Sequence, residues 1–370
     1  MVIPFMTIYC IRQLHFTIDQ AGYIMGLFGL GSICGAFVGG KFTDRFGFYD
    51  LQIAALLSGG ILFIILGYQH TFITLGAGAF ILSFCNESFR PANSSAIAYY
   101  SSAENKTRSY SLNRLAVNLG WAVGGGLGGF LASYNYQSLF WVDGCTNIIA
   151  AIMLLRLIPR ANIIKPVKIQ VKTKASLSAY HDKVYLLFIG FVILYATCFF
   201  QLFTMQPVFY KTQWLFNEKL IGFLMSLNGV LIVIIEMVLI HNLEGRRHPL
   251  SYISAGVILV GFGFALLNVM PPNLLSGLLV VVFITVGEML SMPFMNSFWI
   301  TRTTNQNRGE YAGLYTMAWS TAQVLAPTIG SQIILYGGFN TLWWILGAVC
   351  LLASAGFVIL YRVSCRHVAN

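Results

Sequence analysis

Apolar runs of about 20 residues or more recur along almost the whole chain, separated by short polar stretches. They cover roughly residues 20–42, 49–68, 72–98, 109–133 and 138–158, then 184–210, 219–241, 249–269, 274–300, 309–335 and 339–361. A run of that length is what an α-helix needs to cross the hydrocarbon core of a bilayer. The runs therefore predict an all-α polytopic membrane protein, whose first partner is the lipid bilayer.

The composition supports this class and excludes others. Hydrophobic residues make up 57% of the chain and charged residues only 9%, whereas soluble domains carry about a quarter charged residues. The net charge of +10 comes from Lys and Arg that gather in every second loop, which is typical of membrane topology. Nucleic-acid binding is therefore not expected. Both termini and the basic loops are predicted to lie in the cytoplasm, and a multi-pass protein of the bacterial inner membrane is expected.

The first run, MVIPFMTIYCI, is too short to span a bilayer before Arg12. We interpret it as the outer half of a truncated helix 1. With it, residues 1–158 form an N-terminal bundle of a partial helix 1 and helices 2–6. Residues 159–183 form a basic cytoplasmic linker whose single acid is Asp182, and residues 184–370 hold helices 7–12 and a tail.

An internal repeat is visible at a nearly constant offset. Glu87 and Glu288 each lie a few residues before a proline and are 201 residues apart. Asp44 and Glu244 each follow the end of an apolar run and are 200 residues apart. A glycine-rich stretch of run 109–133 recurs 202 residues later as Ala-Pro-Thr-Ile-Gly. An even number of runs separates the copies, so both halves enter the membrane in the same sense, which predicts a parallel repeat.

A charged turn follows the run 20–42, and Gly40, Asp44, Arg45 and Gly47 have the spacing of a known transporter loop. On these residues the chain resembles the major facilitator superfamily of secondary transporters. The resemblance implies two six-helix bundles, a cytoplasmic gate at this turn, transport by alternating access, a monomer and no cofactor. Glu244 and Arg246 would form the second copy of the gate. Phe48 and Tyr49 stand where the family usually has a basic pair.

Glycines on run 109–133 resemble the superfamily's antiporter motif, with Gly125 in place of its proline. The residues are Gly120, Gly124, Gly128 and Gly129. The motif implies export, and of the drug/proton antiporter type. The alternative is generic packing, because small residues at every fourth position let helices approach closely.

Ionisable residues inside the apolar runs mark candidate transport groups, because they are costly in a bilayer. Glu87 and Arg90 lie three apart on one helical face and can pair, and Arg90 also matches an arginine of the family's helix 4 motif. Together with Glu288 they are predicted to face the central cavity and to couple transport to protons, because a carboxylate in low-dielectric surroundings can exchange a proton near neutral pH. The alternative is a static pair that fixes the helix. Arg114, Asp143 and Glu236 are further ionisable groups of this kind.

Uncharged polar residues at the predicted membrane interior are Gln201, Gln206, Asn228 and Asn296. We interpret Gln201, Asn228 and Asn296 as possible substrate contacts, with hydrogen bonding between helices as the alternative.

The sequence favours a secondary transporter that moves a small organic solute, by proton-coupled efflux. The alternatives are an uptake symporter for a sugar, peptide or metabolite, and a nontransporting or decayed membrane protein. No cluster with nucleophile or metal spacing and no phosphate-binding glycine loop followed by Lys-Ser or Lys-Thr is present, so neither an enzyme, a metal site nor an ATP-driven pump is expected.

Overall fold

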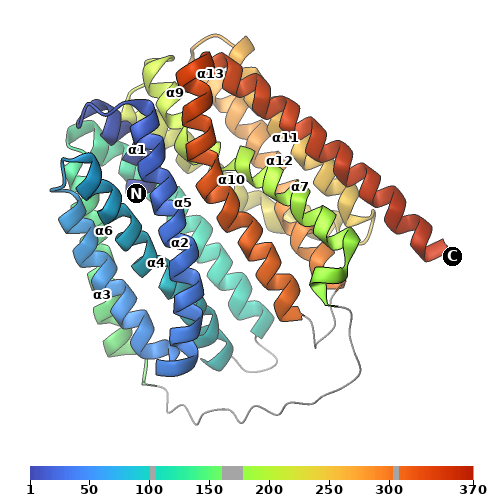
Figure 1. Cartoon of the computed structure of the whole chain (residues 1–370), viewed down its shortest axis with the longest axis horizontal. Helices are drawn as coiled ribbons and strands as arrows, with labels where there is room; N and C mark the ends of the chain where they lie inside the picture. The colour runs from blue at the N-terminus through green and yellow to red at the C-terminus, as the bar shows by residue number, and fades with distance from the viewer. Residues whose placement is uncertain (101–105, 161–177, 303–307, 370) are drawn as a thin grey trace. The chain divides into compact units, whose positions relative to one another are not determined.

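The computed structural model describes residues 1–100, 106–160, 178–302 and 308–369, and the side chains of Asp44 and Arg114 are among those outside this description. Most of the predicted linker also lies outside it. The described chain is built from helices: α1 Val2–Arg12, α2 Ile18–Phe46, α3 Phe48–Leu66, α4 Phe72–Tyr100, α5 Lys106–Tyr134, α6 Gln137–Leu157, α7 Lys183–Phe199, α8 Gln201–Thr204, α9 Gln206–Thr212, α10 Glu218–Leu243, α11 Pro249–Val269, α12 Leu274–Thr301 and α13 Arg308–Ala369 (Figure 1).

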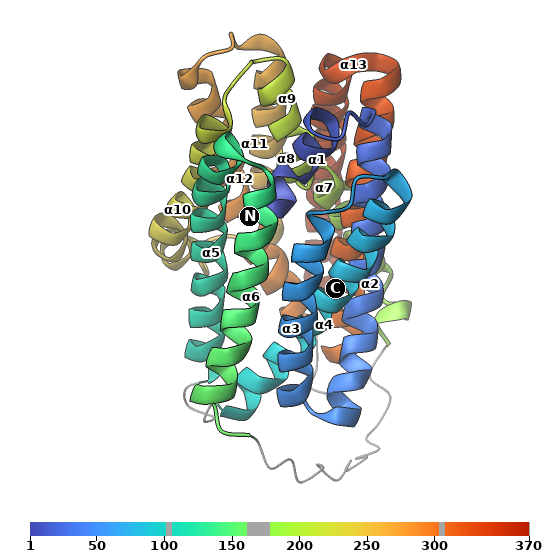
Figure 2. The same cartoon turned by 90° about the vertical axis from the view of Figure 1, so that its left-hand side faces the viewer.

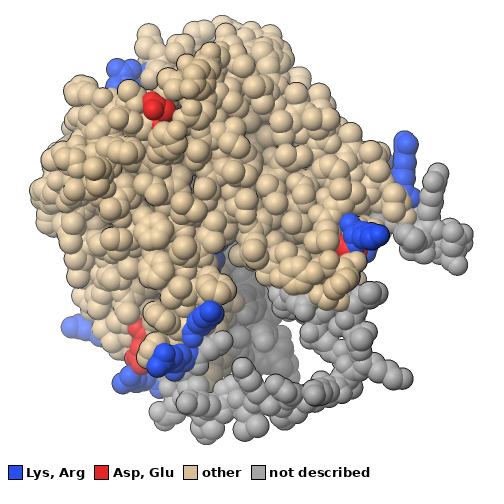
Figure 3. Space-filling view, in the orientation of Figure 1, with Lys and Arg blue, Asp and Glu red and all other residues tan. Residues whose placement is uncertain are grey.

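Ten of these described segments are long and apolar enough to cross a membrane. The longest, Tyr311–Val363, is two helices joined at Gly338, where φ is 76°. α1 is an apolar helix of 11 residues and falls short of a span. On the face shown in Figure 3, the charged side chains lie at the margins of a broad surface of uncharged residues. The fold is thus that of a multi-pass integral membrane protein.

The helices form two compact units. The N-terminal unit comprises Met1–Val117 and Leu131–Ala175, and the C-terminal unit comprises Asn118–Phe130 and Ser176–Asn370. The second part of α5 therefore belongs with the C-terminal helices. The predicted bundle boundaries at residues 158 and 184 remain predictions.

In the N-terminal unit, α2 packs along α4, and α3 packs against both α4 and α6 (Figure 2). Glycines make the α2 contact possible: a Cβ at Gly39 would lie 2.6 Å from Ser88 Cα, and one at Gly35 would overlap the Phe84 carbonyl oxygen. Ser88 Oγ also donates to the Gly35 carbonyl at 3.1 Å. Such close approach holds helices together in lipid, where apolar burial gives little driving force.

In the C-terminal unit the corresponding helices pack in the same pairs, α10 with α12 and α11 with both α12 and α13. Gly256 and Gly287 face each other between α11 and α12, since a Cβ on either would lie 2.5 or 2.6 Å from the carbonyl oxygen of the other. The two units are therefore built on one packing plan.

The turns that follow α1 and α9 show the repeat most closely. His15 and Leu215, 200 residues apart, both have φ of 55°, a conformation uncommon for residues other than glycine. In both turns three backbone hydrogen bonds recur, at 2.9, 3.3 and 3.0 Å before α2 and at 2.8, 3.3 and 2.9 Å before α10. Thr17 and Asn217 then occupy the N-cap of the next helix. This local agreement supports the predicted duplication.

Candidate functional site

A broken helix dominates the interior of the C-terminal unit. The segment Lys183–Thr212 is one apolar span, yet it divides into α7, α8 and α9 with interruptions at Phe200 and Met205. Pro207 at the start of α9 lacks the N–H that would bond the Phe203 carbonyl, so the break has a local cause. Phe200 and Met205 keep right-handed helical dihedrals and the chain keeps its direction there, so the segment is a helix interrupted by two turns.

A cavity lies beside this break. It is partly open, and the space between its walls, counted together with the solvent at its mouth, is about 370 Å³. Its lining is mainly aliphatic and aromatic and comprises Leu202, Phe203, Gln206, Pro207, Tyr210, Ile221, Leu224, Met225, Asn228, Val281 and Ile284. Apolar walls with a few placed polar groups are typical of small-molecule sites.

Two of the polar groups on the wall are paired. Gln206, with 1% of its surface exposed, donates from Nε2 to the Tyr210 hydroxyl at 2.6 Å. Its Oε1 is buried and has no hydrogen-bond partner. The Gln206 amide is therefore held by Tyr210, and its oxygen is enclosed within the fold.

Asn228, on α10, connects the cavity wall to a carboxylate. Its Nδ2 donates to Thr285 Oγ1 at 2.9 Å and to Glu288 Oε2 at 3.1 Å, both on α12. Thr285 in turn donates to the Val281 carbonyl at 2.6 Å. The structure thus brings together Glu288 and Asn228, which the sequence suggested separately as a coupling group and a substrate contact.

Glu87 and Arg90 form the predicted pair on α4 in the N-terminal unit. Arg90 Nε lies 3.0 Å from Glu87 Oε2, and the side chains are 74% and 19% exposed respectively. Glu87 and Glu288 do not occupy equivalent positions of the repeat when the two halves are aligned on their prolines. Pro91 and Pro293 lie 202 residues apart, and the residue 202 positions before Glu288 is Asn86, the neighbour of Glu87. Their coupling role remains a prediction.

The other polar candidates make contacts within their own unit. Gln201 is 1% exposed and donates from Nε2 to the Ala326 carbonyl at 2.7 Å, next to Pro327 of α13. Asn296 accepts from the Trp299 indole at 3.2 Å. Asp143 accepts the Val2 amide at 2.9 Å and so caps α1. Glu236 is buried in α10, at 7% exposure.

At the predicted gate, Gly47 is the C-cap of α2 with φ of 91°, and Gly245, the residue after the C-cap of α10, has φ of 77°. The Asp44 side chain lies outside the described residues. The Arg45 guanidinium lies 5.2 Å from the centre of the Phe46 ring. Gly40 has open space around it. Glu244 and Arg246 are exposed at the second copy of the turn.

The departure at Phe48 and Tyr49 has a structural counterpart. Both side chains are buried, at 6% and 7%, against Ala92 and Ala96 of α4. Apolar packing therefore occupies the place where the superfamily usually carries a basic pair.

The predicted glycine motif lies on α5, where Gly128 and Gly129 are buried, Gly124 is half-buried and Gly120 is exposed. Gly129 lies against α10, because a Cβ there would overlap the Glu218 carbonyl oxygen and lie 2.6 Å from Gly222 Cα. A Cβ on Gly222 would in turn lie 2.6 Å from the Gly125 carbonyl oxygen. This geometry fits close packing of α5 and α10.

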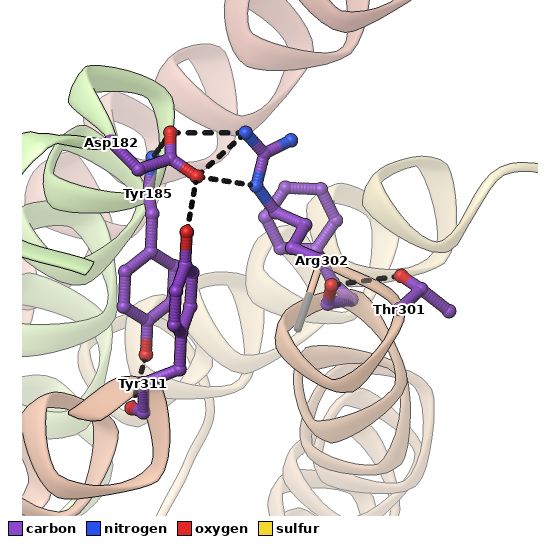
Figure 4. A network of polar contacts seen from close by, with 6 residues as sticks. Asp182, Tyr185, Thr301, Arg302 and Tyr311 are labelled. Atoms are coloured by element: carbon purple, nitrogen blue, oxygen red, sulfur yellow. Dashed lines mark hydrogen bonds and ion pairs between the residues drawn. The ribbon is translucent and has the colours of Figure 1, made fainter. Parts of the chain in front are cut away.

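A polar cluster at the ends of α7, α12 and α13 was not predicted (Figure 4). Asp182 accepts the Tyr185 amide at 3.0 Å, Arg302 at 2.8 Å and the Tyr311 hydroxyl at 2.9 Å. Burial alone would raise the pKa of Asp182, but these hydrogen bonds and the Arg302 charge lower it overall. The only sequence signal was that Asp182 is the single acid of a basic stretch.

The ten membrane-spanning segments, the cavity beside the interrupted helix and the repeated packing of the helices are features of a membrane transporter. A family model described as Major Facilitator Superfamily matches residues 1–325. The chain therefore belongs to the major facilitator superfamily, whose members here are transporters rather than enzymes.

Similar proteins agree with this assignment. Multidrug resistance protein 2 of Bacillus subtilis is 23% identical over 89% of this chain and 83% of its own length. A Na(+), Li(+), K(+)/H(+) antiporter of Planococcus maritimus is 24% identical over 100% of this chain and 94% of its own. Among solved structures, a POT family transporter in complex with a thioalcohol conjugated peptide has a TM-score of 0.79 at 14% identity, covering 98% of this chain and 92% of that one. The nucleoside transporter NupG has a TM-score of 0.76 at 15% identity, with 97% and 94% covered.

Proposed function

We propose that this protein exports a small organic solute in exchange for protons. The observation that carries the proposal is the hydrogen bond between Asn228 and Glu288, which joins the wall of the cavity to a half-buried carboxylate. The resemblance to multidrug resistance proteins supports export, and that to a cation/proton antiporter supports proton exchange.

The chemistry of the pair explains how a proton and a solute could compete. An ionised Glu288 only accepts hydrogen bonds and holds the Asn228 amide through Nδ2. A protonated Glu288 keeps a carbonyl acceptor but loses its charge and gains an O–H donor, so its hold on the Asn228 amide weakens and its O–H can bond another acceptor at the wall of the cavity. Proton uptake thereby changes the polar group that a solute meets.

Replacement of Glu288 by Gln tests the proposal. The full chain is reconstituted in liposomes, a pH gradient is imposed, and the movement of labelled aromatic and aliphatic solutes is followed. The wild type should move solute in response to the gradient, and Glu288→Gln should fall to the rate of empty liposomes, because the amide cannot exchange a proton. Asp50→Asn is the matched control, since Asp50 pairs with Arg160 in an exposed contact at 2.7 Å.

Other results would select the alternatives. Solute uptake that follows the proton inward indicates a symporter for a metabolite, and proton movement driven by Na⁺ or K⁺ without solute indicates a cation antiporter. Transport that is unchanged in Glu288→Gln would contradict the assigned role of this residue.

A further inference from the structure

A histidine ends the second copy of the predicted gate turn. α10 ends at Leu243, and the next helix, α11, has His248 as its N-cap. His248 lies 200 residues after Phe48, the first residue of α3, just as Glu244 lies 200 residues after Asp44. His248 and Phe48 are therefore corresponding residues of the two copies.

The two rings also pack in corresponding places. The Phe48 ring is buried against Ala96 of α4. The centre of the His248 ring lies 6.3 Å from that of Phe298 on α12, and Phe298 follows Ala96 by 202 residues, the offset of the prolines in these helices. The His248 ring also lies 5.2 Å from the Tyr361 ring on α13, centre to centre. Phenylalanine fills this place in the first copy, so packing alone does not account for the imidazole nitrogens.

The imidazole of His248 supplies a hydrogen-bond acceptor to α11. Its Nδ1 accepts the Leu250 amide at 3.3 Å, and Leu250 is fully buried. Pro249 has no N–H, and the Ser251 amide donates to the His248 carbonyl at 2.9 Å. The Leu250 amide thus depends on the imidazole, because a buried N–H without a partner is costly. The start of α3 has no side-chain cap of this kind, so the cap distinguishes the second copy.

Proton uptake would end this hydrogen bond. An imidazole accepts at Nδ1 only when it is neutral and carries its hydrogen on Nε2, whereas the imidazolium donates from both nitrogens. The charged ring would also stand at the N-terminus of α11, where the helix dipole disfavours a cation. Protonation of His248 and capping of α11 therefore exclude each other.

The surroundings of the imidazole favour its neutral form. On the described elements around it, the charged and titratable groups are Tyr361 of α13, Arg302 of α12, which lies 5.6 Å from the centre of the Phe298 ring, and Glu244, Arg246 and Arg247 of its own turn. Arg302 is paired with Asp182, and no carboxylate of the described chain contacts the imidazole. Burial lowers the pKa of His248 below its ordinary value of 6.5. The ring is therefore neutral near pH 7 and takes up a proton only in more acidic surroundings.

We propose that His248 is a pH-sensitive cap on the second copy of the gate turn, which holds the start of α11 at neutral pH and releases it on acidification. The Tyr252 hydroxyl donates to the Leu243 carbonyl at 3.0 Å, so release loosens the turn without separating the two helices. The first copy has Phe48 at this position and does not titrate. Acid on this side of the membrane would therefore act on one half of the predicted gate only.

Hydrogen exchange of the Leu250 amide tests the proposal in the detergent-purified full chain. Exchange is followed by mass spectrometry from about pH 8 to about pH 5 and is expressed as protection relative to an unstructured amide at the same pH. In the wild type, protection should fall about tenfold, because the side-chain cap is lost and a cation stands at the helix start. The Ser276 amide is the internal control, since it is capped at 2.9 Å by Asn273, which does not titrate. Its protection should change by less than about twofold.

Two substitutions separate the states of the cap. His248→Asn supplies an acceptor oxygen at every pH, so Leu250 should stay protected throughout. His248→Phe introduces the residue of the first copy, which keeps a ring but no acceptor, so protection should be low throughout. The wild type should match the first variant at neutral pH and the second in acid, and the Ser276 amide shows in each case that the C-terminal unit is folded.

Three results would overturn the proposal. They are wild-type protection of Leu250 that does not change with pH, a fall in His248→Asn as large as in the wild type, and protection in His248→Phe equal to that of the wild type at neutral pH. The measurement needs no substrate, so it is separable from transport. A pH-dependent cap in a protein that moves no solute would contradict the proposed function alone, and solute movement with a pH-independent cap would contradict this proposal alone.

Discussion

At the scale of single residues, Asp182 has the best-defined electrostatic role outside the membrane spans. Its pKa is lowered in the folded protein, so its contribution to stability is fully present above the ordinary Asp range and is lost as the pH falls through the lowered value. Asp182→Asn should therefore lower thermal stability at pH 7 by about 2 kcal/mol, because Arg302 loses its charged partner.

The measurement is a thermal unfolding series in detergent from neutral to acidic pH. The difference between wild type and Asp182→Asn should begin to shrink as the pH falls below the ordinary Asp pKa of about 4, and should vanish once the pH passes below the lowered pKa of the folded carboxylate. Asp50→Asn removes an exposed ion pair and should change stability little. A pH-independent difference would show that the contribution is steric.

Single polar residues inside apolar runs were easier to identify than the residues with which they pair. The sequence singles out Glu288 and Asn228 because polar groups are rare in apolar runs. It does not show that they form a hydrogen bond, because they are 60 positions apart in the sequence and lie on different helices. Gln206 was noticed as a polar residue of its run, but its unpaired oxygen does not follow from a single helix. Such properties depend on which faces of different helices meet.

At the scale of helices, contact between α5 and α10 depends on glycine at particular positions. Gly222→Val should weaken this packing, because its Cβ would lie 2.6 Å from the Gly125 carbonyl oxygen. We expect a loss of roughly 1–3 kcal/mol in stability and reduced transport. Gly120→Val, on the open side of α5, is the matched control, and thermal unfolding of both variants is the measurement.

Equal effects of the two substitutions would mean that the close contact of Gly222 with α5 is not what makes Gly222→Val destabilising. The sequence predicted small-residue packing on α5, but spacing by four includes both Gly120, which is open, and Gly129, which is in contact. The face that packs is set by the partner helix. Nothing in the α5 sequence identifies Gly222 as that partner.

At the scale of the whole molecule, the distribution of Lys and Arg predicts which loops lie in the cytoplasm. In a variant lacking the natural cysteines, His70→Cys and Arg246→Cys place single thiols on exposed positions of loops predicted to lie on opposite sides. A membrane-impermeant maleimide should label the first in intact spheroplasts and the second only after permeabilisation. Labelling of both from one side would refute the predicted topology.

The helical class and the membrane spans were predictable, because the length and hydropathy of each run can be read from a short stretch of sequence. The duplication stays a prediction, which the repeated turns and helix pairs support. The break of Lys183–Thr212 into three helices was not, although Pro207 marks the place. A proline alone does not tell whether neighbouring helices will seal the gap or leave a cavity beside it. The cavity depends on the volumes of side chains contributed by α10 and α12.

The division of the segment Lys183–Thr212 into α7, α8 and α9 also affects how this segment would contact a bound molecule. Pro207 removes one hydrogen bond from the helical ladder at the start of α9. The cavity lies beside this position, and its wall includes residues of both α8 and α9. A molecule held there would touch both segments at once, so any change in the angle between α8 and α9 would change its contacts.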